Sequence, residues 1–253
     1  MVIERCVSWQ RPPVSLTLQS DAVHIWRAPL DVAEGRAEAL RRSLSVDEIS
    51  RAEQFLLAQD RDRFIVARGL LRAILGNYLR VAPGRVRFVY GPLGKPALAP
   101  EFSRSQIHFN LSHSDDLALC AVARGRRIGV DLERARPIPD ARQIVEQFFS
   151  PREITAFAAL SPSRRARGFL RFWTCKEAYL KAKGEGLAVA LDRVDVSVVP
   201  GRPARLLSVD GDTLEASRWS LRELHPAPGY VAALVVEGRG AHVSWRSEGI
   251  CRA

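Results

Sequence analysis

The stretch SRRARGFLRFWTCKEAYLKAKG, residues 163–184, decides how this chain is expected to fold. Its apolar residues recur at helical spacing, and the glycine at its end favours the left-handed conformation that terminates a helix. An earlier segment, Arg61 to Tyr78, has the same character, with one apolar face formed by Phe64, Ala67, Leu71 and Leu75. We therefore predict two long amphipathic helices, one in each half of the chain.

The surroundings of the two helical segments are also alike. A capping box precedes each one, Ser45 to Glu48 in the first half and Ser150 to Glu153 in the second, where Pro151 takes the first helical position. Matching positions recur 108 residues apart, namely Arg63-Phe64 with Arg171-Phe172, Arg68 with Lys176, Gly76 with Gly184, and the strand-like runs Arg85 to Val89 with Arg193 to Ser197. This repetition indicates two copies of one structural unit.

The order of these elements predicts an α+β fold. Apolar runs later in each half, Leu117 to Val122 and Tyr230 to Val236, have the composition of buried strands. We expect two similar halves, residues 1–125 and 126–237, packed as an intramolecular pseudo-dimer. The tail, residues 238–253, is expected to be loosely attached.

Composition is that of an ordinary globular protein. Hydrophobic residues make up 47% of the 253 residues and charged residues 26%, and no apolar run approaches the ~20 residues of a membrane span. Met1 to Gln10 carry Glu4 and Arg5 and have no apolar core segment, so we expect no signal peptide. The four cysteines are far apart in the sequence and have no spacing typical of a metal site. They are Cys6, Cys120, Cys175 and Cys251. We therefore expect a cytoplasmic protein with no membrane association.

The charge of the chain points to an anionic partner. A formal net charge of +10 attracts nucleic acids, phosphorylated small molecules and acidic proteins alike. Of the 38 basic residues only four are lysines, and Lys176, Lys181 and Lys183 fall within eight residues. An ammonium group is a compact, mobile charge that suits phosphate. The clustering of three lysines therefore indicates that this segment needs such charges for its chemistry.

Two acidic residues share one face of a predicted strand. Ile128 to Glu133 has alternating side chains, which places Asp131 and Glu133 on the same side. Paired carboxylates suit Mg²⁺, which keeps several waters and takes the rest of its ligands from carboxylates and substrate phosphates. The alternative is a solvent-facing strand end whose acids pair with neighbouring arginines, Arg126, Arg127 or Arg134.

A third acidic residue lies in the second long helix. Glu177 and Lys181 are one helical turn apart, so the carboxylate could complete a metal site or accept a proton among the lysines. The alternative is an exposed Glu–Lys pair on an amphipathic helix, with Trp173 and Tyr179 in the core.

Two further motifs could contact phosphate. The segment Phe109 to Ser114 places Ser112 beside His113, just before an apolar strand; the alternative for His113 is a structural role. The turn Gly91 to Pro96 presents Lys95, and alone it would be an ordinary surface loop. Neither of the glycine-rich nucleotide-binding fingerprints, of the P-loop or dinucleotide type, is present.

In this order, the four motifs resemble those of the 4′-phosphopantetheinyl transferases of the surfactin-synthetase-activating type. The shared motifs are Gly94-Lys95-Pro96, Asn110 to Ser114, Gly129 to Glu133, and Trp173 to Lys181. The resemblance implies a Mg²⁺-dependent enzyme that transfers the 4′-phosphopantetheine group of coenzyme A to a serine of an apo acyl- or peptidyl-carrier protein. The products would be the holo-carrier and adenosine 3′,5′-bisphosphate, and the active site would lie between the two halves.

The resemblance also implies a role for individual residues. Asp131, Glu133 and Glu177 match the Mg²⁺ ligands, and the groups that match contacts to the coenzyme A phosphates are Lys95, Ser112, His113, Lys176 and Lys181. The nearest candidates for the 3′-phosphate are Arg51 and Arg63, although Glu48 stands where some relatives have a lysine. We expect Glu177, beside Lys181, to accept the serine proton. Carrier proteins of this kind are acidic, so the net positive charge would assist docking to a monomeric enzyme.

Two other classes of protein are alternatives to such an enzyme. A nucleic-acid-binding protein would explain the positive charge, but it predicts interleaved aromatic and basic residues and a known binding motif, and neither is found. An inactive protein that retains the fold is disfavoured because Asp131, Glu133, Glu177 and Lys181 are all present. We therefore expect an enzyme that does not bind nucleic acid as its function.

Overall fold

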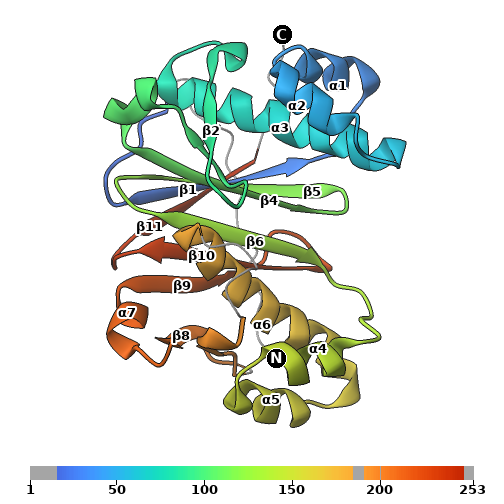
Figure 1. Ribbon diagram of the computed structural model, residues 1–253, viewed down its shortest axis with the longest axis vertical. Helices are drawn as coiled ribbons and strands as arrows, with labels where there is room; N and C mark the ends of the chain where they lie inside the picture. Colours follow the sequence, from blue (N-terminus) through green and yellow to red (C-terminus); the bar gives the residue numbers. More distant parts are fainter. Residues whose placement is uncertain (1–15, 185–190, 200, 248–253) are drawn as a thin grey trace.

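Four layers follow one another through the molecule: a long helix, a first sheet, a second sheet and another long helix (Figure 1). The computed structural model describes residues 16–184, 191–199 and 201–247. The outer layers are formed by α3 (Ala58–Leu79) and α6 (Pro162–Lys183), the two helices predicted from the apolar spacing. The predicted α+β fold of two halves is confirmed, and Gly184 ends α6 with a φ of 82° as expected.

The first sheet has the strand order β11-β1-β5-β4. Its strands are β1 (Ala22–Pro29), β4 (Ile107–Ser114), β5 (Leu117–Arg124) and β11 (His242–Ser247). The second sheet has the order β6-β10-β9, built from β6 (Ile128–Arg134), β9 (Trp219–Leu224) and β10 (Tyr230–Glu237). Pairing is antiparallel throughout these two sheets, except between β1 and β11.

Alternating side chains divide the core into layers. Leu119 and Ala121 of β5 pack against Val130 of β6 and Leu234 of β10 between the two sheets. The other face of the second sheet packs on α6, and the other face of the first packs on α3. Both faces of each sheet are thus covered, so β5 and β10 are buried along nearly their whole length.

Shorter elements surround the long helices. On the first half these are α1 (Glu34–Arg41), α2 (Val46–Ala52), the 3₁₀ helices η1 (Pro83–Arg85) and η2 (Pro100–Ser105), and a hairpin of β2 (Phe88–Tyr90) and β3 (Pro96–Leu98). On the second half they are α4 (Ala141–Phe148), α5 (Pro151–Ala158), α7 (Thr213–Ser217), η3 (Leu191–Arg193), and a hairpin of β7 (Val194–Ser197) and β8 (Arg205–Val209).

Both predicted capping boxes are present, and each one carries a buried ion pair. At the start of α2, Glu48 pairs with Arg72 of α3 at 2.6 Å and also with Arg68. At the start of α5, Glu153 pairs with Lys176 of α6 at 2.6 Å. The acid of the capping box thus anchors the long helix in each half. The ion pair is therefore repeated in the two halves along with the capping box itself.

This correspondence corrects the register of the repeat. The helices α3 and α6 both have 22 residues and are offset by 104 positions, which matches Arg72 with Lys176 and the helix cap Arg80 with Gly184. The 108-residue offset holds only at the 3₁₀ turns, because α3 ends at Leu79 before Pro83, whereas α6 ends at Lys183 before Leu191. The predicted pairings within the helices, Arg63-Phe64 with Arg171-Phe172, Arg68 with Lys176, and the glycine pair Gly76 with Gly184, are therefore wrong by one helical turn.

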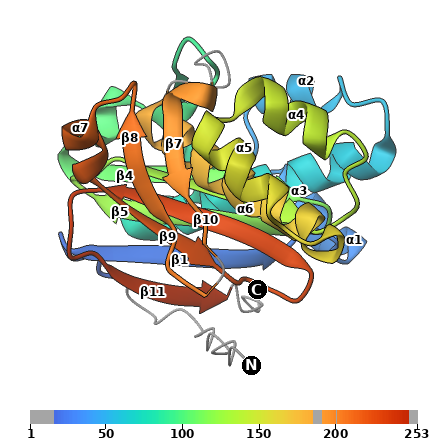
Figure 2. The same ribbon diagram turned by 90° about the horizontal axis from the view of Figure 1, so that it is seen from below.

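The tail is not loosely attached where the structure describes it. His242–Ser247 form β11, which runs parallel to β1 of the first sheet, and the two strands lie side by side in Figure 2. Val243 and Trp245 pack against the core between the sheets. The chain thus returns from the second half to complete the first sheet. Among the described helices, none is long and apolar enough to cross a membrane.

Candidate active site

A close contact between α6 and β6 creates the site. A methyl group on Gly129 of β6 would meet the carbonyl oxygen of Ala178 at 2.0 Å and the amide nitrogen of Ala182 at 2.4 Å. Only glycine permits this approach of helix backbone to strand. As a result, Glu177 and Lys181, one turn apart on α6, lie over the face of β6 that carries Asp131.

Asp131 is the centre of the cluster. Only 3% of it is exposed, and its Oδ1 accepts hydrogen bonds from the Ser112 hydroxyl at 3.1 Å and from Lys181 Nζ. Its Oδ2 is buried and finds no hydrogen-bond partner among the described residues. A buried carboxylate oxygen without a donor is costly, and it favours the binding of a cation.

Alongside burial, the charge of Asp131 helps to raise the pKa of the other two carboxylates. Burial and, next, the charge of Asp131 raise the pKa of Glu177 to about 7, and Lys181 offsets this only in part. Burial and Asp131 also raise the pKa of Glu133, against a hydrogen bond from Ser114. One oxygen of Glu177, Oε1, is buried without a partner in the described part of the chain. The three acids therefore form one electrostatic unit with a deficit of positive charge.

This arrangement fits a hydrated, substrate-linked Mg²⁺ better than a closed metal cage. Within residues 16–184, 191–199 and 201–247, no three His, Cys, Asp or Glu side chains converge closely enough to hold a metal ion as they stand. Mg²⁺ takes one or two carboxylates, several waters and substrate phosphates. The unpartnered oxygens of Asp131 and Glu177 supply such a partial set of hard oxygen ligands.

Side chains of β4 connect the site to the first half. Asn110, Ser112 and Ser114 point at β6 and accept hydrogen bonds from its backbone N–H groups, those of Val130, Leu132 and Arg134, at 2.8, 3.2 and 3.1 Å. The two sheets share no backbone ladder there, since β4 and β6 are edge strands of different sheets. Ser112, predicted as a phosphate contact, is thus engaged by Asp131, Leu132 and Lys181.

The three clustered lysines have three different partners. Lys181 Nζ lies on Asp131, as part of the site. Lys176 is fully buried, and its ammonium donates to Glu153 and to the carbonyl oxygens of Leu191 and Val194. The structure therefore does not bring Lys176 to the carboxylate cluster, contrary to the expected contact with the pyrophosphate. The reason is helical geometry, because positions 176 and 181 face different sides of α6.

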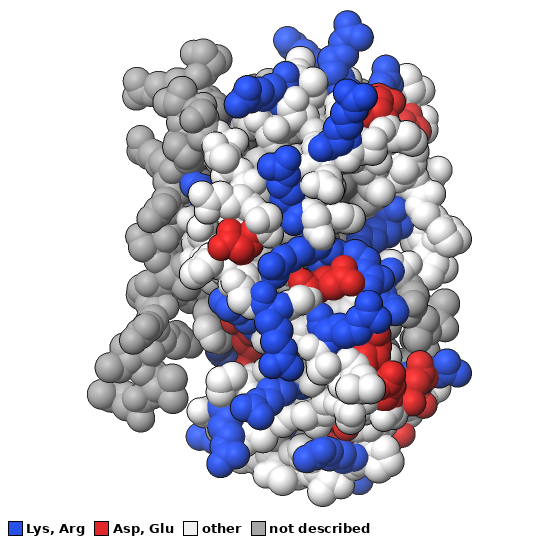
Figure 3. All heavy atoms as spheres, turned by 90° about the vertical axis from the view of Figure 1, so that its left-hand side faces the viewer, with Lys and Arg blue, Asp and Glu red and all other residues white. Residues whose placement is uncertain are grey.

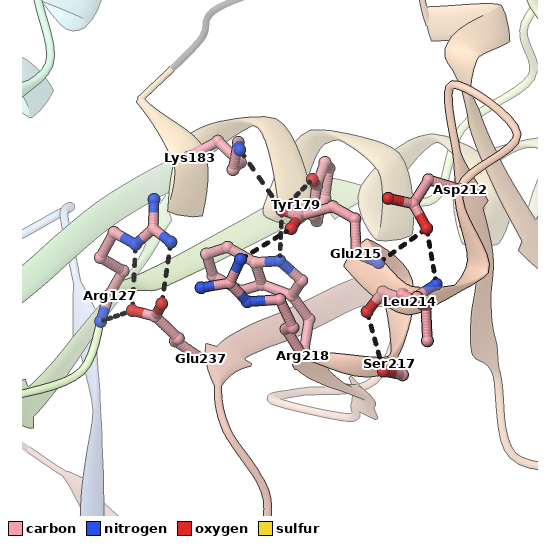
Figure 4. Close-up of polar contacts among 10 residues, drawn as sticks. Arg127, Tyr179, Lys183, Asp212, Leu214, Glu215, Ser217, Arg218 and Glu237 are labelled. Carbon is pink, nitrogen blue, oxygen red and sulfur yellow. Dashed lines mark hydrogen bonds and ion pairs between the residues drawn. The ribbon is translucent and has the colours of Figure 1, made fainter.

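The third lysine helps to hold the end of α6. Lys183 Nζ lies 3.3 Å from Glu215, and this carboxylate also accepts hydrogen bonds from Tyr179 and from the indole of Trp219 (Figure 4). Beside it, Arg127 forms a two-pronged ion pair with Glu237. Glu215 thus ties the end of α6 to α7 and to the start of β9, while Arg127 and Glu237 join the neighbouring ends of β6 and β10.

Lys95 is held at the same end of α6. Its ammonium donates to the carbonyl oxygen of Lys181 and approaches those of Ile128 and Ala182 at 3.4 Å. Burial, followed by the charge of Arg127, lowers the pKa of Lys95 to about 8. The predicted turn is present, with Gly94 at a φ of 76°, and Lys95 thereby links the first half to the backbone of the second.

The other predicted phosphate contacts, His113 and Arg63, come from β4 and α3 of the first half. The pKa of His113 is lowered by desolvation and by the positive charges of Lys181 and Arg63. Arg63 pairs with Asp31 through two hydrogen bonds of 2.9 and 3.1 Å and lines a groove of ≈ 1410 Å³ with α1 and α2. Arg51 lies over the ring of Phe64, and Phe64 is the residue that follows Arg63 in the chain. Glu48, by contrast, is buried in its ion pairs.

One face of the molecule is strongly basic. Figure 3 shows Lys and Arg side chains in a band down the side that lies to the left in Figure 1, interrupted by small acidic groups. This distribution is consistent with the net charge of +10 and gives the face an attraction for anionic partners.

Comparison with known proteins yields a consistent result. A model described as "4′-phosphopantetheinyl transferase, N-terminal" matches residues 33–124, and one described as "4′-phosphopantetheinyl transferase superfamily" matches residues 127–235. The chain is 46% identical over 233 residues to the 4′-phosphopantetheinyl transferase HetI of Nostoc sp., covering 92% of this chain and 95% of HetI. It is 28% identical over 153 residues to Sfp of Bacillus subtilis, covering 60% and 66%.

Solved structures show similarity over part of the chain. One is the holo-(acyl-carrier-protein) synthase from Bacillus anthracis, with a TM-score of 0.36 and 22% identity, covering 44% of this chain and 96% of that one.

Proposed function

Because the chain belongs to the 4′-phosphopantetheinyl transferase superfamily, with the two-domain organisation of the Sfp type, we propose how its residues divide the work of transfer. The enzyme moves the 4′-phosphopantetheine group of coenzyme A to a carrier protein. We assign Asp131, Glu133 and Glu177 to Mg²⁺, and Lys181 with His113 and Arg63 to the phosphates of coenzyme A.

The metal assignment is supported by the two unpartnered buried oxygens of Asp131 and Glu177. When bound, Mg²⁺ would neutralise charge on the pyrophosphate of coenzyme A. The carboxylates of Asp131 and Glu133 are held in place on β6 because each one accepts a hydrogen bond from a serine of β4. Lys181 adds a positive charge beside Asp131, where it can also reach an anionic ligand.

Glu177 is our candidate for the proton acceptor. A general base works best when its pKa lies near the operating pH, and burial with the charge of Asp131 raises the pKa of Glu177 to about 7. In this role, the carboxylate takes the proton of the attacking carrier serine while the leaving adenosine 3′,5′-bisphosphate keeps both electrons of the broken P–O bond. Glu177 then carries the proton until water removes it.

The partners follow from charge and topology. We infer that the carrier is an acidic acyl- or peptidyl-carrier protein that the basic face attracts. Both halves, residues 1–125 and 126–237, contribute to one site in one chain, so we infer a monomer. The described cysteines, Cys120 and Cys175, are buried free thiols, which supports a cytoplasmic location.

The unpartnered oxygens on β6 and α6 carry this proposal, and two isosteric variants test it. Both Asp131→Asn and Glu177→Gln should slow single-turnover transfer to an apo carrier, measured by intact mass, and the loss of the base in Glu177→Gln should slow it by roughly 10²–10⁴-fold. Raised Mg²⁺ should partly rescue a weakened ligand but not a missing base. Glu223→Gln, which disturbs an ion pair with Arg171 elsewhere on α6, is the matched control and should stay near wild type.

The pH dependence gives a second readout. Because the pKa of Glu177 is raised, the carboxyl is protonated below about 7 and cannot accept a proton. At limiting Mg²⁺ the wild-type rate should therefore rise with pH through about 7 and then level off. A folded Asp131→Asn variant with wild-type turnover would overturn the metal assignment, and a wild-type pH profile in Glu177→Gln would remove Glu177 as the base.

A further inference from the structure

The hydroxyl of Ser112 has a complete set of hydrogen bonds. A serine hydroxyl has one proton to donate and two lone pairs that accept. Ser112 accepts from the N–H of Leu132 at 3.2 Å and from Lys181 Nζ at 3.2 Å, which uses both lone pairs. Its proton can therefore go only to Asp131 Oδ1, 3.1 Å away.

Ser114 repeats this arrangement two residues along the strand. It accepts from the N–H of Arg134 at 3.1 Å and donates to Glu133 Oε2 at 3.1 Å. In both cases a backbone N–H of β6 fixes the serine as an acceptor, and the serine proton then holds the carboxylate of the preceding β6 residue. The period of two along both strands produces this repetition.

The geometry points to Ser112 and Ser114 as positioning residues that aim the carboxylates of Asp131 and Glu133 at the magnesium site. This inference rests on the proposed function. Each serine engages one oxygen of its carboxylate and leaves the other for the cation, as at Asp131, where Oδ2 has no partner among the described residues. Without these donors, two like charges on one strand face would turn apart.

Asn110 offers a control that distinguishes the positioning of a carboxylate from the linking of β4 to β6. Its side-chain oxygen accepts from the N–H of Val130 at 2.8 Å, the same link between β4 and β6 that the serines make. The residue of β6 that would correspond to a carboxylate is Gly129, so Asn110 holds no acid. Substitution of Asn110 therefore removes only a hydrogen bond between β4 and β6. Substitution of either serine removes such a hydrogen bond and also the contact with a carboxylate.

The experiment measures Mn²⁺ binding by the intact chain, from the free-ion signal in electron paramagnetic resonance. Ser112→Ala and Ser114→Ala should each weaken Mn²⁺ binding by about 10-fold or more, since groups that orient metal ligands typically contribute 10–100-fold to affinity. Ser114→Thr keeps the hydroxyl and should restore most of it. Asn110→Ala should lower the thermal midpoint but change Mn²⁺ affinity less than about 2-fold.

The outcomes distinguish this inference from the proposal beneath it. If Asp131→Asn abolishes Mn²⁺ binding but both serine variants bind like wild type, the positioning role is overturned and the metal site stands. If Asp131→Asn leaves Mn²⁺ binding unchanged, the metal assignment falls and the serine inference falls with it. If Asn110→Ala weakens binding as much as the serine variants do, the effect belongs to the bridge, and positioning is rejected.

Discussion

At the scale of single residues, the three clustered lysines show how one sequence signal can divide into separate roles. Lys181 meets Asp131 in the site, Lys176 meets Glu153 in the core, and Lys183 meets Glu215 at the helix end. The side chain of Lys176 is 0% exposed and that of Lys181 is 30% exposed, so only the latter can reach a soluble ligand. Lys176 acts as a structural ion-pair partner.

Lys176→Met and Lys181→Met should therefore fail in different ways. Removing one partner of a buried ion pair costs roughly 3–5 kcal/mol, so Lys176→Met should lower the free energy of unfolding by that amount. Its transfer activity, measured below its melting temperature, should be nearly normal. Lys181→Met should lose transfer, with a smaller loss of stability that Mg²⁺ partly restores. Urea unfolding with and without Mg²⁺, beside a transfer assay, checks both.

The reverse outcome would reassign the two lysines. If Lys176→Met were as stable as wild type and weakened coenzyme A binding, the ammonium would have a role at the ligand and not in the core.

At the scale of elements, the packing of α6 on β6 is the feature on which the site depends. Gly129 allows the backbone of Ala178 and Ala182 to approach the strand, and this contact sets the height of Glu177 above Asp131. The glycine of the Gly-x-Asp-x-Glu motif is thus a packing residue, whereas the acids that follow it are the proposed metal ligands. A motif can combine both because residues two apart in a strand line one face, so the glycine and both acids of β6 lie on the side that α6 covers.

Gly129→Ala should damage stability and metal binding together. The added methyl would overlap backbone atoms, which cannot turn aside like a side chain, so α6 must move away from β6. Overpacking of this kind costs typically 1–3 kcal/mol and can cost more. The measurements are the free energy of unfolding and Mn²⁺ affinity.

Gly35→Ala is the matched control. Gly35 lies in α1 with no atom within 4 Å of the added methyl, and its substitution should be neutral or stabilise by about 0.4–1 kcal/mol. Wild-type metal affinity in Gly129→Ala would show that the α6–β6 contact does not set the site.

At the scale of the whole molecule, we expect charge to govern the approach of the carrier. The net charge of +10 and the basic face in Figure 3 favour encounter with an acidic protein. Such attraction acts over a Debye length of about 10 Å at 0.1 M salt and only about 3 Å at 1 M. The cluster to which we assign the chemical step is partly buried, and salt screens such charges much less.

Added NaCl should therefore raise the apparent KM for the carrier while kcat changes little. Steady-state transfer over a range of NaCl concentrations measures both constants, with other anions of equal ionic strength as controls for specific ion effects. Duplex DNA should compete at low salt only, as a nonspecific polyanion. A KM for the carrier that is independent of salt would contradict docking through the basic face.

The sequence by itself determined the features that depend on neighbours in the chain. The capping boxes at Ser45 and Ser150, the glycine that ends α6, and the acids that alternate along β6 are set by helix and strand periodicity within a few residues. The four motifs from Gly94 to Lys181, taken in their order along the chain, also indicated the family, which the relatives confirm.

Only the tertiary structure decided which distant groups meet. It placed Lys176 on Glu153, shifted the repeat of the long helices to 104 positions, and paired β11 with β1. It also directed Ser112 and Ser114 at the acids of β6, a contact that sequence analysis predicted for neither serine, although their spacing of two along the chain was visible. Such pairings depend on how two separate edge strands and a helix pack, and nothing in the local sequence of one element specifies its partner on another.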